Sequence, residues 1–499
     1  MGVPYYFYKI YTAFNNITIP IESIPKNVEY LFFDYNSLIH PCAQVAIKTF
    51  SENGGKNNVE SEIIKQTINY TRYIISLVKP RNIYIMIDGV APMGKLHQQK
   101  ERRYKSNFLN PNNLWDSNNI TPGTPFMSNL TESLSREFPD VIISDSNEPG
   151  EGEHKMIRII SNLVNPESIM IYGLDGDLLM LSLLSKWSES IILIRDNSFN
   201  EKLAEVDKTF MFVDIKVLCE CVYNESVNKI KSFGISKNEF IRDYIFLCFF
   251  LGNDFVEHIP SISIRDNGLA VVQKIYIKLL GKYNRSLTYP DIHGGFLTEL
   301  VKEIGSCEDY YFDKIFKMSK LKEPLPEQEL TKSIHFMQDN YIYGHRDFKS
   351  RYYLFYNVYN SSNLSEICKK YIESIYWTWG YYNGHKHDNW SWSYKFPVAP
   401  FASTLYNFLR TFDFKQINFK KDNPITPLEQ LLIVLPPGSL VNINESYKRV
   451  FRVNSKTLHS KFPNKLLIDL HNREWIWQSK VLFNDNNESV NLLDYFSDV

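Results

Sequence analysis

The sequence predicts an α/β fold with a doubly wound, mostly parallel β-sheet and helical additions. In its first half, one arrangement recurs: a short apolar run that ends in an acidic residue. These runs lie at 29–34, 82–88, 141–145 and 168–175. Runs of this length that are apolar throughout are typical of strands buried on both faces of a parallel sheet. Helical patterns at 63–78 and 154–163 lie between the runs, and such alternation favours a doubly wound sheet.

The acidic residues at the strand ends predict one shared site. In an open parallel sheet, ligands bind beyond the carboxyl ends of the strands, so acids that recur there converge on one crevice. Two further pairs flank single glycines, in EGE at 151–153 and DGD at 175–177. Another acid follows the very apolar stretch 243–251, which predicts a buried helix. The predicted set is Asp34, Asp88, Glu151, Glu153, Asp175, Asp177 and Asp254.

The chemistry of such a set favours metal binding. Each acid alone could be a helix N-cap or could complement a helix dipole. Together, carboxylates in one crevice repel each other unless a cation is present. Mg²⁺ prefers oxygen ligands, and two such ions about 4 Å apart can hold the attacking and leaving oxygens of a phosphodiester. The seven acids therefore predict a catalytic site for two Mg²⁺ ions, with Mn²⁺ as a substitute.

A basic helix is predicted at 95–105, shortly after Asp88. Its candidate ligand-binding residues are Lys95, Gln99, Arg102 and Arg103. The first three recur at offsets of four and three, which places them on one helical face. Arginine and lysine on such a face suit a terminal phosphate, which accepts several charge-assisted hydrogen bonds. A solvated basic face is the alternative, and the nearby acidic crevice favours phosphate binding.

An aromatic-dense block at 371–400 forms a third group. It contains Trp377, Trp379, Tyr381, Tyr382, Trp390, Trp392 and Tyr394. Aromatic rings can stack on unpaired bases with little regard to sequence, but most of these rings are expected in the core. His40, six residues beyond Asp34, is a further candidate for the crevice.

Composition excludes several other classes of protein. The net charge of −1 predicts no global attraction to nucleic acid, although it can hide an acidic pocket beside a basic one. The six cysteines form no C-x-x-C pair, which favours reduced thiols in a cytosolic or nuclear compartment over a zinc site. No apolar run is long enough to span a membrane, and the first residues lack the pattern of a signal peptide.

Eight segments, in this order, resemble the XRN family of 5′→3′ exoribonucleases. They are MGVPYYF, LFFDYNSLIH, MIDGVAPMGKLHQQKERR, EPGEGEHK, YGLDGDLLML, FLGNDFVEHIP, WSWSYKFPVAPF and TPLEQLLIVLPPGS. The resemblance covers residues 1 to about 445, with a weaker middle. It implies a PIN/FEN-like nuclease core at 1–285 with the metal site and a 5′-phosphate pocket. A helical, polar connecting region is expected at 286–365, and a second conserved region packed on the core at 366–499.

The resemblance also implies roles for the candidate residues. The seven acids match the family's metal-binding carboxylates. The pocket for a 5′-monophosphate matches Lys95, Gln99, Arg102 and Arg103. His40 matches a histidine that stacks on a terminal base, and its partner is either Trp390 or Trp392. One departure is Gly176, which replaces the alanine usual between the two aspartates.

The expected function is two-metal hydrolysis of single-stranded RNA with a 5′-monophosphate, releasing 5′-mononucleotides in the decay of decapped mRNA. The decapping machinery is an expected partner, a membrane is not, and a monomer is expected. The expected location is the cytoplasm, with a viral factory or virion if the source is a large DNA virus, and the nucleus left open. Two alternatives stay open: a flap-type, structure-specific DNA nuclease, and a non-catalytic scaffold that binds RNA ends.

Overall fold

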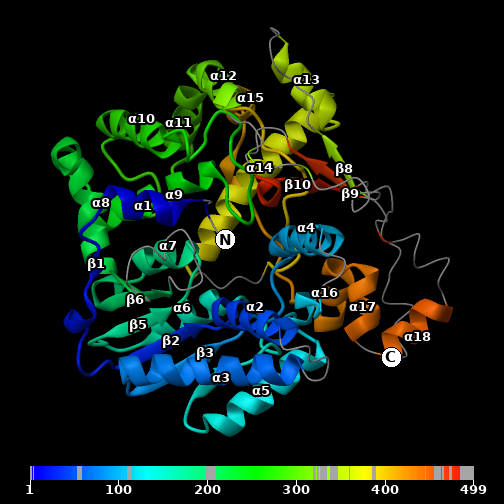
Figure 1. Ribbon diagram of the computed structural model, residues 1–499. Helices are drawn as coiled ribbons and strands as arrows, with labels where there is room; N and C mark the ends of the chain where they lie inside the picture. Colours follow the sequence, from blue (N-terminus) through cyan, green and yellow to red (C-terminus); the bar gives the residue numbers. More distant parts are fainter. Residues whose placement is uncertain are drawn as a thin grey trace.

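A seven-stranded sheet forms the centre of the computed structural model (Figure 1). The structure describes residues 3, 5–52, 59–109, 114–196, 210–318, 322, 325, 334–337, 347–358, 360–384, 389–443, 445–453, 462, 466–470 and 475–483. The strands of this sheet are β1 (Thr18–Ile19), β2 (Tyr30–Asp34), β3 (Asn82–Met86), β4 (Ile142–Ser144), β5 (Ile169–Tyr172), β6 (Ile191–Asp196) and β7 (Phe210–Asp214). Their spatial order is β1-β7-β6-β5-β2-β3-β4.

The order and direction of the strands confirm the predicted fold class. Strands β6, β5, β2, β3 and β4 are parallel to one another, whereas β7 is antiparallel to both β6 and β1. The chain runs outward from β2 to β3 and β4, then crosses to β5 and β6 on the other side of β2. The topological switch point therefore lies between β2 and β5, where a doubly wound sheet binds its ligands.

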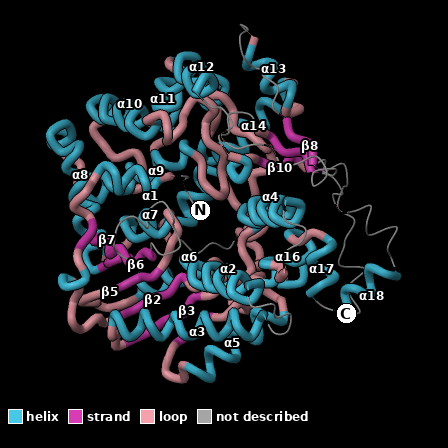
Figure 2. The backbone as a smooth tube through the Cα atoms, viewed as in Figure 1, coloured by secondary structure: helices cyan, strands magenta, loops and turns pink. Residues whose placement is uncertain are grey.

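Helices surround the strands (Figure 2). The α-helices are α1 (Tyr6–Ala13), α2 (Asn36–Glu52), α3 (Val59–Val78), α4 (Met93–Leu109), α5 (Pro125–Glu137), α6 (Gly152–Asn162), α7 (Asp177–Leu184), α8 (Ile215–Ile230), α9 (Lys237–Cys248), α10 (Gly268–Tyr283), α11 (Gly294–Ser306), α12 (Glu308–Met318), α13 (Phe348–Phe355), α14 (Ser361–Tyr382), α15 (Ala402–Leu409), α16 (Pro427–Val434), α17 (Pro437–Ile443) and α18 (Glu445–Val453). The short 3-10 helices are η1 (Ile21–Ser23), η2 (Ser117–Asn119), η3 (Ser188–Ser190), η4 (Lys231–Phe233), η5 (Phe249–Leu251), η6 (Phe414–Gln416) and η7 (Ile476–Gln478). None of the described helices has the length and apolarity needed to cross a bilayer.

The sheet separates two hydrophobic cores because alternate side chains of a strand point to opposite faces. On β2, Leu31 and Phe33 pack in one core with Leu38 of α2 and Leu130 of α5. Phe32 points to the other core, which also contains residues of α6 to α11, α14 and α15. Figure 1 shows α2 and α3 crossing the first of these faces. Layers on both faces are what strands without a polar side require.

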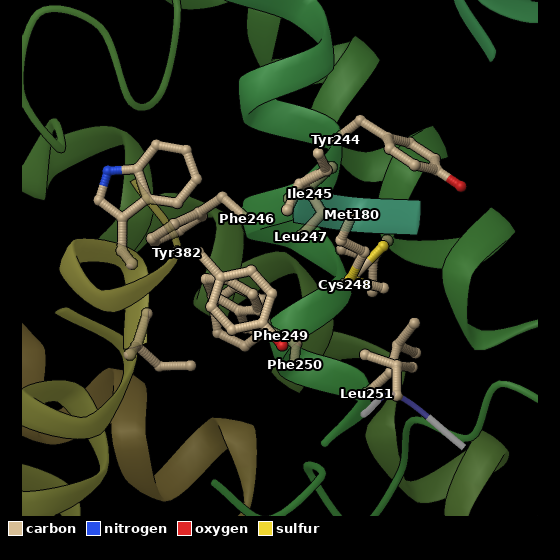
Figure 3. Close-up of a cluster of buried hydrophobic side chains, with 14 of the residues drawn as sticks. Met180, Tyr244, Ile245, Phe246, Leu247, Cys248, Phe249, Phe250, Leu251 and Tyr382 are labelled. Carbon is tan, nitrogen blue, oxygen red and sulfur yellow. The ribbon is translucent and has the colours of Figure 1, made fainter. Parts of the chain in front are cut away.

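The predicted buried helix at 243–251 is confirmed, and it ends in a 3-10 turn. A capping box between Ser236 and Glu239 starts α9, and η5 continues it to Leu251. Figure 3 shows this apolar segment packed against α14, where Phe249 meets Tyr382 edge to face at 5.1 Å between ring centroids. Gly252 then turns the chain at φ +82°, a conformation that favours glycine. The turn leads directly to Asp254.

The C-terminal part of the chain builds a smaller core around α4. Helix α16 begins with a capping box between Thr426 and Glu429 and packs on α4. A second sheet, of order β10-β9-β8, contains β8 (Ile334–Met337), β9 (Leu466–Asp469) and β10 (Lys480–Leu482). Leu96 and Tyr104 of α4 share one hydrophobic cluster with residues of α16, α17, β9 and β10. Helix α4 is therefore held from outside by segments more than 300 residues away in the sequence.

Candidate active site

A cavity of about 850 Å³ opens beyond the carboxyl ends of β2, β3 and β5. It brings together most of the residues predicted from the sequence. Its acidic lining residues are Asp34, Asp88, Glu151, Glu153 and Asp175. Its other predicted lining residues are His40, Lys95, Gln99, Arg102 and Arg103. The cavity thus has an acidic half at the switch point of the sheet and a basic half along α4.

Local hydrogen bonds orient the two acids that follow β2 and β3. Asp34 is the last residue of β2, and its carboxylate accepts a hydrogen bond from the Ser37 hydroxyl. The Asp88 carboxylate accepts a hydrogen bond from the backbone N–H of Gly152, at 2.6 Å. Gly152 is the first residue of α6, where the helix dipole stabilises a negative charge. The Asp88 N–H in turn donates to the Asn36 side chain at 3.2 Å.

Steric contacts explain why glycine occupies position 152, between the two glutamates. A Cβ atom at Gly152 would lie 2.7 Å from the Met86 carbonyl oxygen and 3.3 Å from carboxylate oxygens of Asp34 and Asp88. Any side chain would therefore push the start of α6 away from the sheet. Because glycine permits this approach, Glu151 and Glu153 reach the cavity from the N-terminus of α6.

The last two predicted acids lie behind the cavity wall. Asp177, the first residue of α7, is only 1% exposed. Burial, followed by the charges of Asp175 and Asp254, raises the pKa of Asp177 to about 7. The Asp254 carboxylate accepts hydrogen bonds from Lys95 and from Gln98, each at 2.5 Å. Both acids therefore belong electrostatically to the cluster that lines the cavity.

The acidic half has the properties of a site for a hard divalent cation. Burial and then Asp88 raise the pKa of Asp34 to about 7, and burial with Asp175 and Asp177 raises the pKa of Glu153 well above its usual value. Among the described residues, buried oxygens of Glu153 and Asp177 have no hydrogen-bond partner. A buried carboxylate oxygen without a partner costs folding free energy unless it coordinates a cation. An all-oxygen donor set fits Mg²⁺ or Mn²⁺ rather than a thiolate-binding metal.

Lys95 lies where the two halves of the cavity meet. Its ammonium group contacts Glu151 at 2.7 Å and Asp254 at 2.5 Å. Burial alone would lower the pKa of Lys95, but these carboxylates raise it well above its usual value. Lys95 is therefore a permanent cation whose side chain is directed toward the acids, not toward the arginines with which the helical face had grouped it.

The rest of the basic half is held by contacts from distant segments. The side-chain oxygen of Gln99 accepts a hydrogen bond from the side-chain NH₂ group of Gln430 in α16, at 3.5 Å. The side-chain oxygen of Gln430 in turn accepts one from the Ala91 N–H, at 3.1 Å. Arg102 is exposed at the cavity wall. His40 is exposed to solvent where it lines the same cavity, and desolvation by the cavity, followed by the charges of Arg102 and Arg103, lowers its pKa to about 4. His40 is therefore neutral at physiological pH.

The aromatic block touches the site through a tyrosine rather than a tryptophan. Tyr381 donates a hydrogen bond to Glu151 at 2.8 Å, and its ring lies 3.7 Å from that of His154. Trp392 stacks on the buried Trp377 at 5.4 Å between ring centroids. Trp390 accepts a hydrogen bond from the Met93 N–H through its backbone oxygen. Neither Trp390 nor Trp392 lines the cavity, and base stacking by His40 with one of them stays a prediction.

Two positively charged residues that support the site were not identified from the sequence. Lys155 is 2% exposed and donates to the backbone oxygens of Ile87 and Asp145, at 2.9 and 2.8 Å. Arg195 donates to the backbone oxygen of Asp175 at 3.0 Å. A charge inside an otherwise apolar strand, as in IILIRD at 191–196, is the signal that could have pointed to Arg195.

Comparisons with known proteins agree with the resemblance. Residues 1–197 match the family model of the XRN 5'-3' exonuclease N-terminus, and residues 235–343 and 316–489 match that of the Xrn1 helical domain. The 5'-3' exoribonuclease 2 of Debaryomyces hansenii is 24% identical over 94% of this chain and 65% of its own length. The 5'-3' exoribonuclease 1 of Homo sapiens is 26% identical over 97% of this chain and 33% of its own length.

The chain thus spans between 33% and 65% of the length of these two curated relatives. Among solved structures, the T5 D15 protein co-crystallised with metal ions aligns with a TM-score of 0.30 and 12% identity, over 58% of this chain and 96% of that chain. The two family models, by contrast, cover strands β1 to β6 of the sheet that carries the acids and the helices that pack around α4. The chain belongs to the XRN family of 5′→3′ exonucleases.

Proposed function

We propose that this chain degrades single-stranded RNA from a 5′-monophosphorylated end and releases 5′-mononucleotides. The observation that carries the proposal is one cavity in which a carboxylate cluster meets the cationic side of α4. Family membership supports the same activity, since the relatives are exoribonucleases by name. Both alternatives considered from the sequence lack this combined support.

In this proposal, the acidic half holds two Mg²⁺ ions, with Mn²⁺ as a substitute. The residues that would hold them are Asp34, Asp88, Glu151, Glu153, Asp175, Asp177 and Asp254. When bound, the ions would activate a water molecule and stabilise the leaving oxygen of the phosphodiester. The protein keeps the carboxylates in place through the α6 N-terminus at Asp88 and through Tyr381 at Glu151.

The basic half would select the end of the strand. Gln99, Arg102 and Arg103 offer charge-assisted and neutral donors that suit a terminal phosphate. Lys95 would neutralise charge between the terminal phosphate and the acidic cluster, because its ammonium lies at the boundary of the two halves. With the terminal phosphate bound on α4, the next phosphodiester would face the carboxylates. Cleavage there would release one nucleotide from the 5′ end.

A preference for a 5′-monophosphate would place this chain after removal of the cap. Its substrates would be decapped mRNAs in the cytoplasm, and the decapping machinery would be its functional partner. A monomer suffices for this activity, because all the proposed residues come from one chain. Neutral His40, with Trp390 or Trp392, would stack on the terminal base and favour single strands.

The test compares three RNAs of one sequence that carry a 5′-monophosphate, a 5′-hydroxyl or a 5′-triphosphate. With Mg²⁺ present, only the first is expected to be degraded, from its 5′ end and to mononucleotides. A DNA strand of the same sequence with a 5′-monophosphate is the control for the sugar. Equal degradation of all three RNAs, or products cut internally, would contradict the proposal, as would RNA binding without any Mg²⁺-dependent release.

A further inference from the structure

One arginine of the basic half is held in a fixed position by a loop outside α4. The Arg103 guanidinium donates from Nη1 to the Thr121 hydroxyl and to the Asn118 side-chain oxygen, the latter at 3.4 Å. Thr121 is 0% exposed and Asn118 is 5% exposed. Both contacts use Nη1, so the Nε and Nη2 side of the guanidinium takes no part in them. The loop therefore fixes one edge of a planar, five-donor group.

The Thr121 hydroxyl is restricted to the role of acceptor toward Arg103. A hydroxyl has one proton to donate, and Thr121 gives it to the backbone oxygen of Asn118 at 2.6 Å. The lone pairs of the Thr121 hydroxyl are then free to accept the hydrogen bond from Arg103. This direction makes the position selective for a hydrogen-bond donor such as Arg103, and it disfavours rotation of the arginine away from the loop.

The loop itself is anchored at both ends and from behind. At its start, the Asp116 side chain accepts a hydrogen bond from the Asn118 N–H at 2.9 Å. At its end, the Thr124 hydroxyl donates to the Asn119 backbone oxygen at 2.6 Å. From behind, the Asn118 side-chain NH₂ group donates to the Ser439 hydroxyl of α17 at 2.9 Å. The position of Arg103 thus depends on a helix of the C-terminal core.

The same loop forms part of the cavity wall. Ser117, Asn118 and Ile120 line the cavity together with Arg102 and Arg103. Asn118 therefore contacts Arg103 with one side-chain atom, holds α17 with the other, and borders the space that the 5′ end would occupy. The loop is rigid by its hydrogen bonds and adjacent to the proposed phosphate, which is what a preorganised anion site requires.

We infer that Thr121 and Asn118 are positioning residues for recognition of a terminal phosphate monoester, because they hold Arg103 in the cavity lining through Nη1 alone and leave Nε and Nη2 out of this contact. This inference rests on the proposed function and adds a second group of residues to the recognition of the 5′ end. It assigns part of that specificity to a loop, residues 116–121, which lies outside α4 and outside the acidic cluster. The loop acts through Arg103 and takes no part in the cleavage step.

The experiment uses Thr121→Val, which keeps the shape of the side chain and removes the hydroxyl. Loss of a hydrogen bond to a charged donor predicts a KM for 5′-monophosphorylated RNA raised at least about tenfold. The kcat and the Mg²⁺ dependence are expected to stay within about twofold, since no interaction made only in the transition state is lost. The preference for a 5′-monophosphate over a 5′-hydroxyl should fall by the same factor as KM rises. Thr121→Ser, which restores the hydroxyl, should behave as the wild type.

A matched control and a second variant make the result decisive. Thr67→Val removes an equally buried hydroxyl from α3, where it donates to the Ile63 backbone oxygen away from the cavity lining, and should leave the preference unchanged. Asn118→Leu, of similar size, should reproduce the effect of Thr121→Val. Thermal melting identifies any variant that fails to fold, and the other variant then decides. If a folded Thr121→Val or Asn118→Leu protein keeps the wild-type preference, the inference is overturned while the proposed function stands. If the wild type itself shows no preference, both fall.

Discussion

Among single residues, Lys95 joins the two functions of the cavity. Its ammonium contacts two carboxylates of the acidic half, while its backbone belongs to the helix that carries Arg102 and Arg103. A buried cation needs buried anions beside it, and Glu151 and Asp254 meet that need. In return, Lys95 offsets part of the repulsion within the acidic cluster. A bound phosphate and a bound metal ion would therefore both change the electrostatic interactions of the Lys95 ammonium group.

The buried Asp177 gives the most direct test of the carboxylate cluster. Asp177→Asn keeps the shape of the side chain and removes its charge. We expect kcat to fall at least about 100-fold, because even residues that only orient metal ligands cost about 10- to 100-fold when changed. RNA affinity should change little, since Arg102 and Arg103 are untouched. Single-turnover kinetics and fluorescence anisotropy measure the two quantities separately.

Asp145 provides the control for this substitution. It also follows an apolar strand, but its carboxylate accepts a hydrogen bond from the Asn147 N–H at 3.0 Å and does not line the cavity. Asp145→Asn should therefore retain turnover close to the wild type. Wild-type turnover in Asp177→Asn, or equal losses in both variants, would contradict the assignment of the cluster.

His40 should stay uncharged through the physiological range. Its pKa of about 4 in the folded protein lies below the 6.5 of an unperturbed histidine. Any stability that depends on this difference is present above pH 6.5 and is lost as the pH falls toward 4, because only the unfolded state then gains the proton readily. The NMR signal of the His40 ring, assigned by comparison with His40→Gln, should not titrate between pH 5.5 and 8. A midpoint near 6.5 would contradict this prediction.

At the level of elements, α4 depends on partners on its outer side. Its residues are mostly polar, so the helix depends on packing of its few apolar residues, such as Leu96 and Tyr104, against other segments. Tyr104 donates to the Leu435 backbone oxygen at 3.3 Å, next to α16. Lys105, on the C-terminal side, donates to backbone oxygens of Ile476 and Ser479. Figure 1 shows α4 beside α16 and near β10.

Replacing Lys105 by methionine should loosen this outer contact. Met keeps an unbranched side chain but removes the ammonium that donates to the Ser479 backbone oxygen, whereas the Ile476 oxygen still accepts from the Ser479 N–H. Each unpaired buried acceptor costs about 1–3 kcal/mol, so the unfolding midpoint in urea should fall measurably. Lys100→Met is the comparison, since Lys100 contacts the Phe483 ring by a cation–π interaction 4.6 Å from its centroid. Cation–π contacts at exposed sites contribute only about 0.5–1 kcal/mol, and Lys100 is only partly buried. A smaller effect of Lys105→Met than of Lys100→Met would be the opposite of what we expect.

The strands show both the reach and the limit of prediction from the sequence. The apolar runs in the sequence correctly predicted β2, β3, β4 and β5, because a buried strand can be identified from its own residues without knowing which strands it pairs with. The runs of β6 and β7 also end in aspartates, Asp196 and Asp214, yet these have structural roles. Asp196 accepts from the Tyr70 hydroxyl, and Asp214 caps α8 by accepting from the Val217 N–H. The pattern alone does not separate them from Asp34, because strand order decides which strand ends meet.

The same reasoning explains where the candidate site was predictable. Strand β7 runs antiparallel to β6, so its carboxyl end lies at the opposite edge of the sheet from Asp34. Only β2, β3 and β5, which are neighbours in the middle of the sheet, bring the acids that follow them into the cavity, and the order of strands is set by long-range pairing. Helical spacing gave the cavity-facing side of α4 but not the direction of the Lys95 side chain. The supporting loop at 116–121 had no chemical signal, since its role depends on contacts with α4 and α17.

Across the whole molecule, a net charge of −1 conceals a strong separation of charge. The acids gather at the switch point between the two cores, and the arginines face them from α4. The fold brings these groups together at a cost, because the raised pKa values of Asp34 and Asp177 show that ionisation is disfavoured in the folded state. The stability of the protein should therefore respond to cations and to pH at this one place.

A divalent cation should stabilise the folded protein, and more so at alkaline pH. Because Asp34 and Asp177 have pKa values raised to about 7, their contribution to stability is present at low pH and is lost as the pH rises through 7. A bound cation reverses this loss, since it favours the ionised carboxylates. At 100 times its Kd, an ion that binds only the folded state adds about 2.7 kcal/mol to the free energy of unfolding. The melting temperature with Mg²⁺, compared with a chelator, should therefore rise more at pH 8 than at pH 5.5. Asp177→Asn should reduce this difference, whereas Asp145→Asn should preserve it. If neither Mg²⁺ nor Mn²⁺ changes the melting temperature at pH 8, the acidic half of the cavity binds no metal ion.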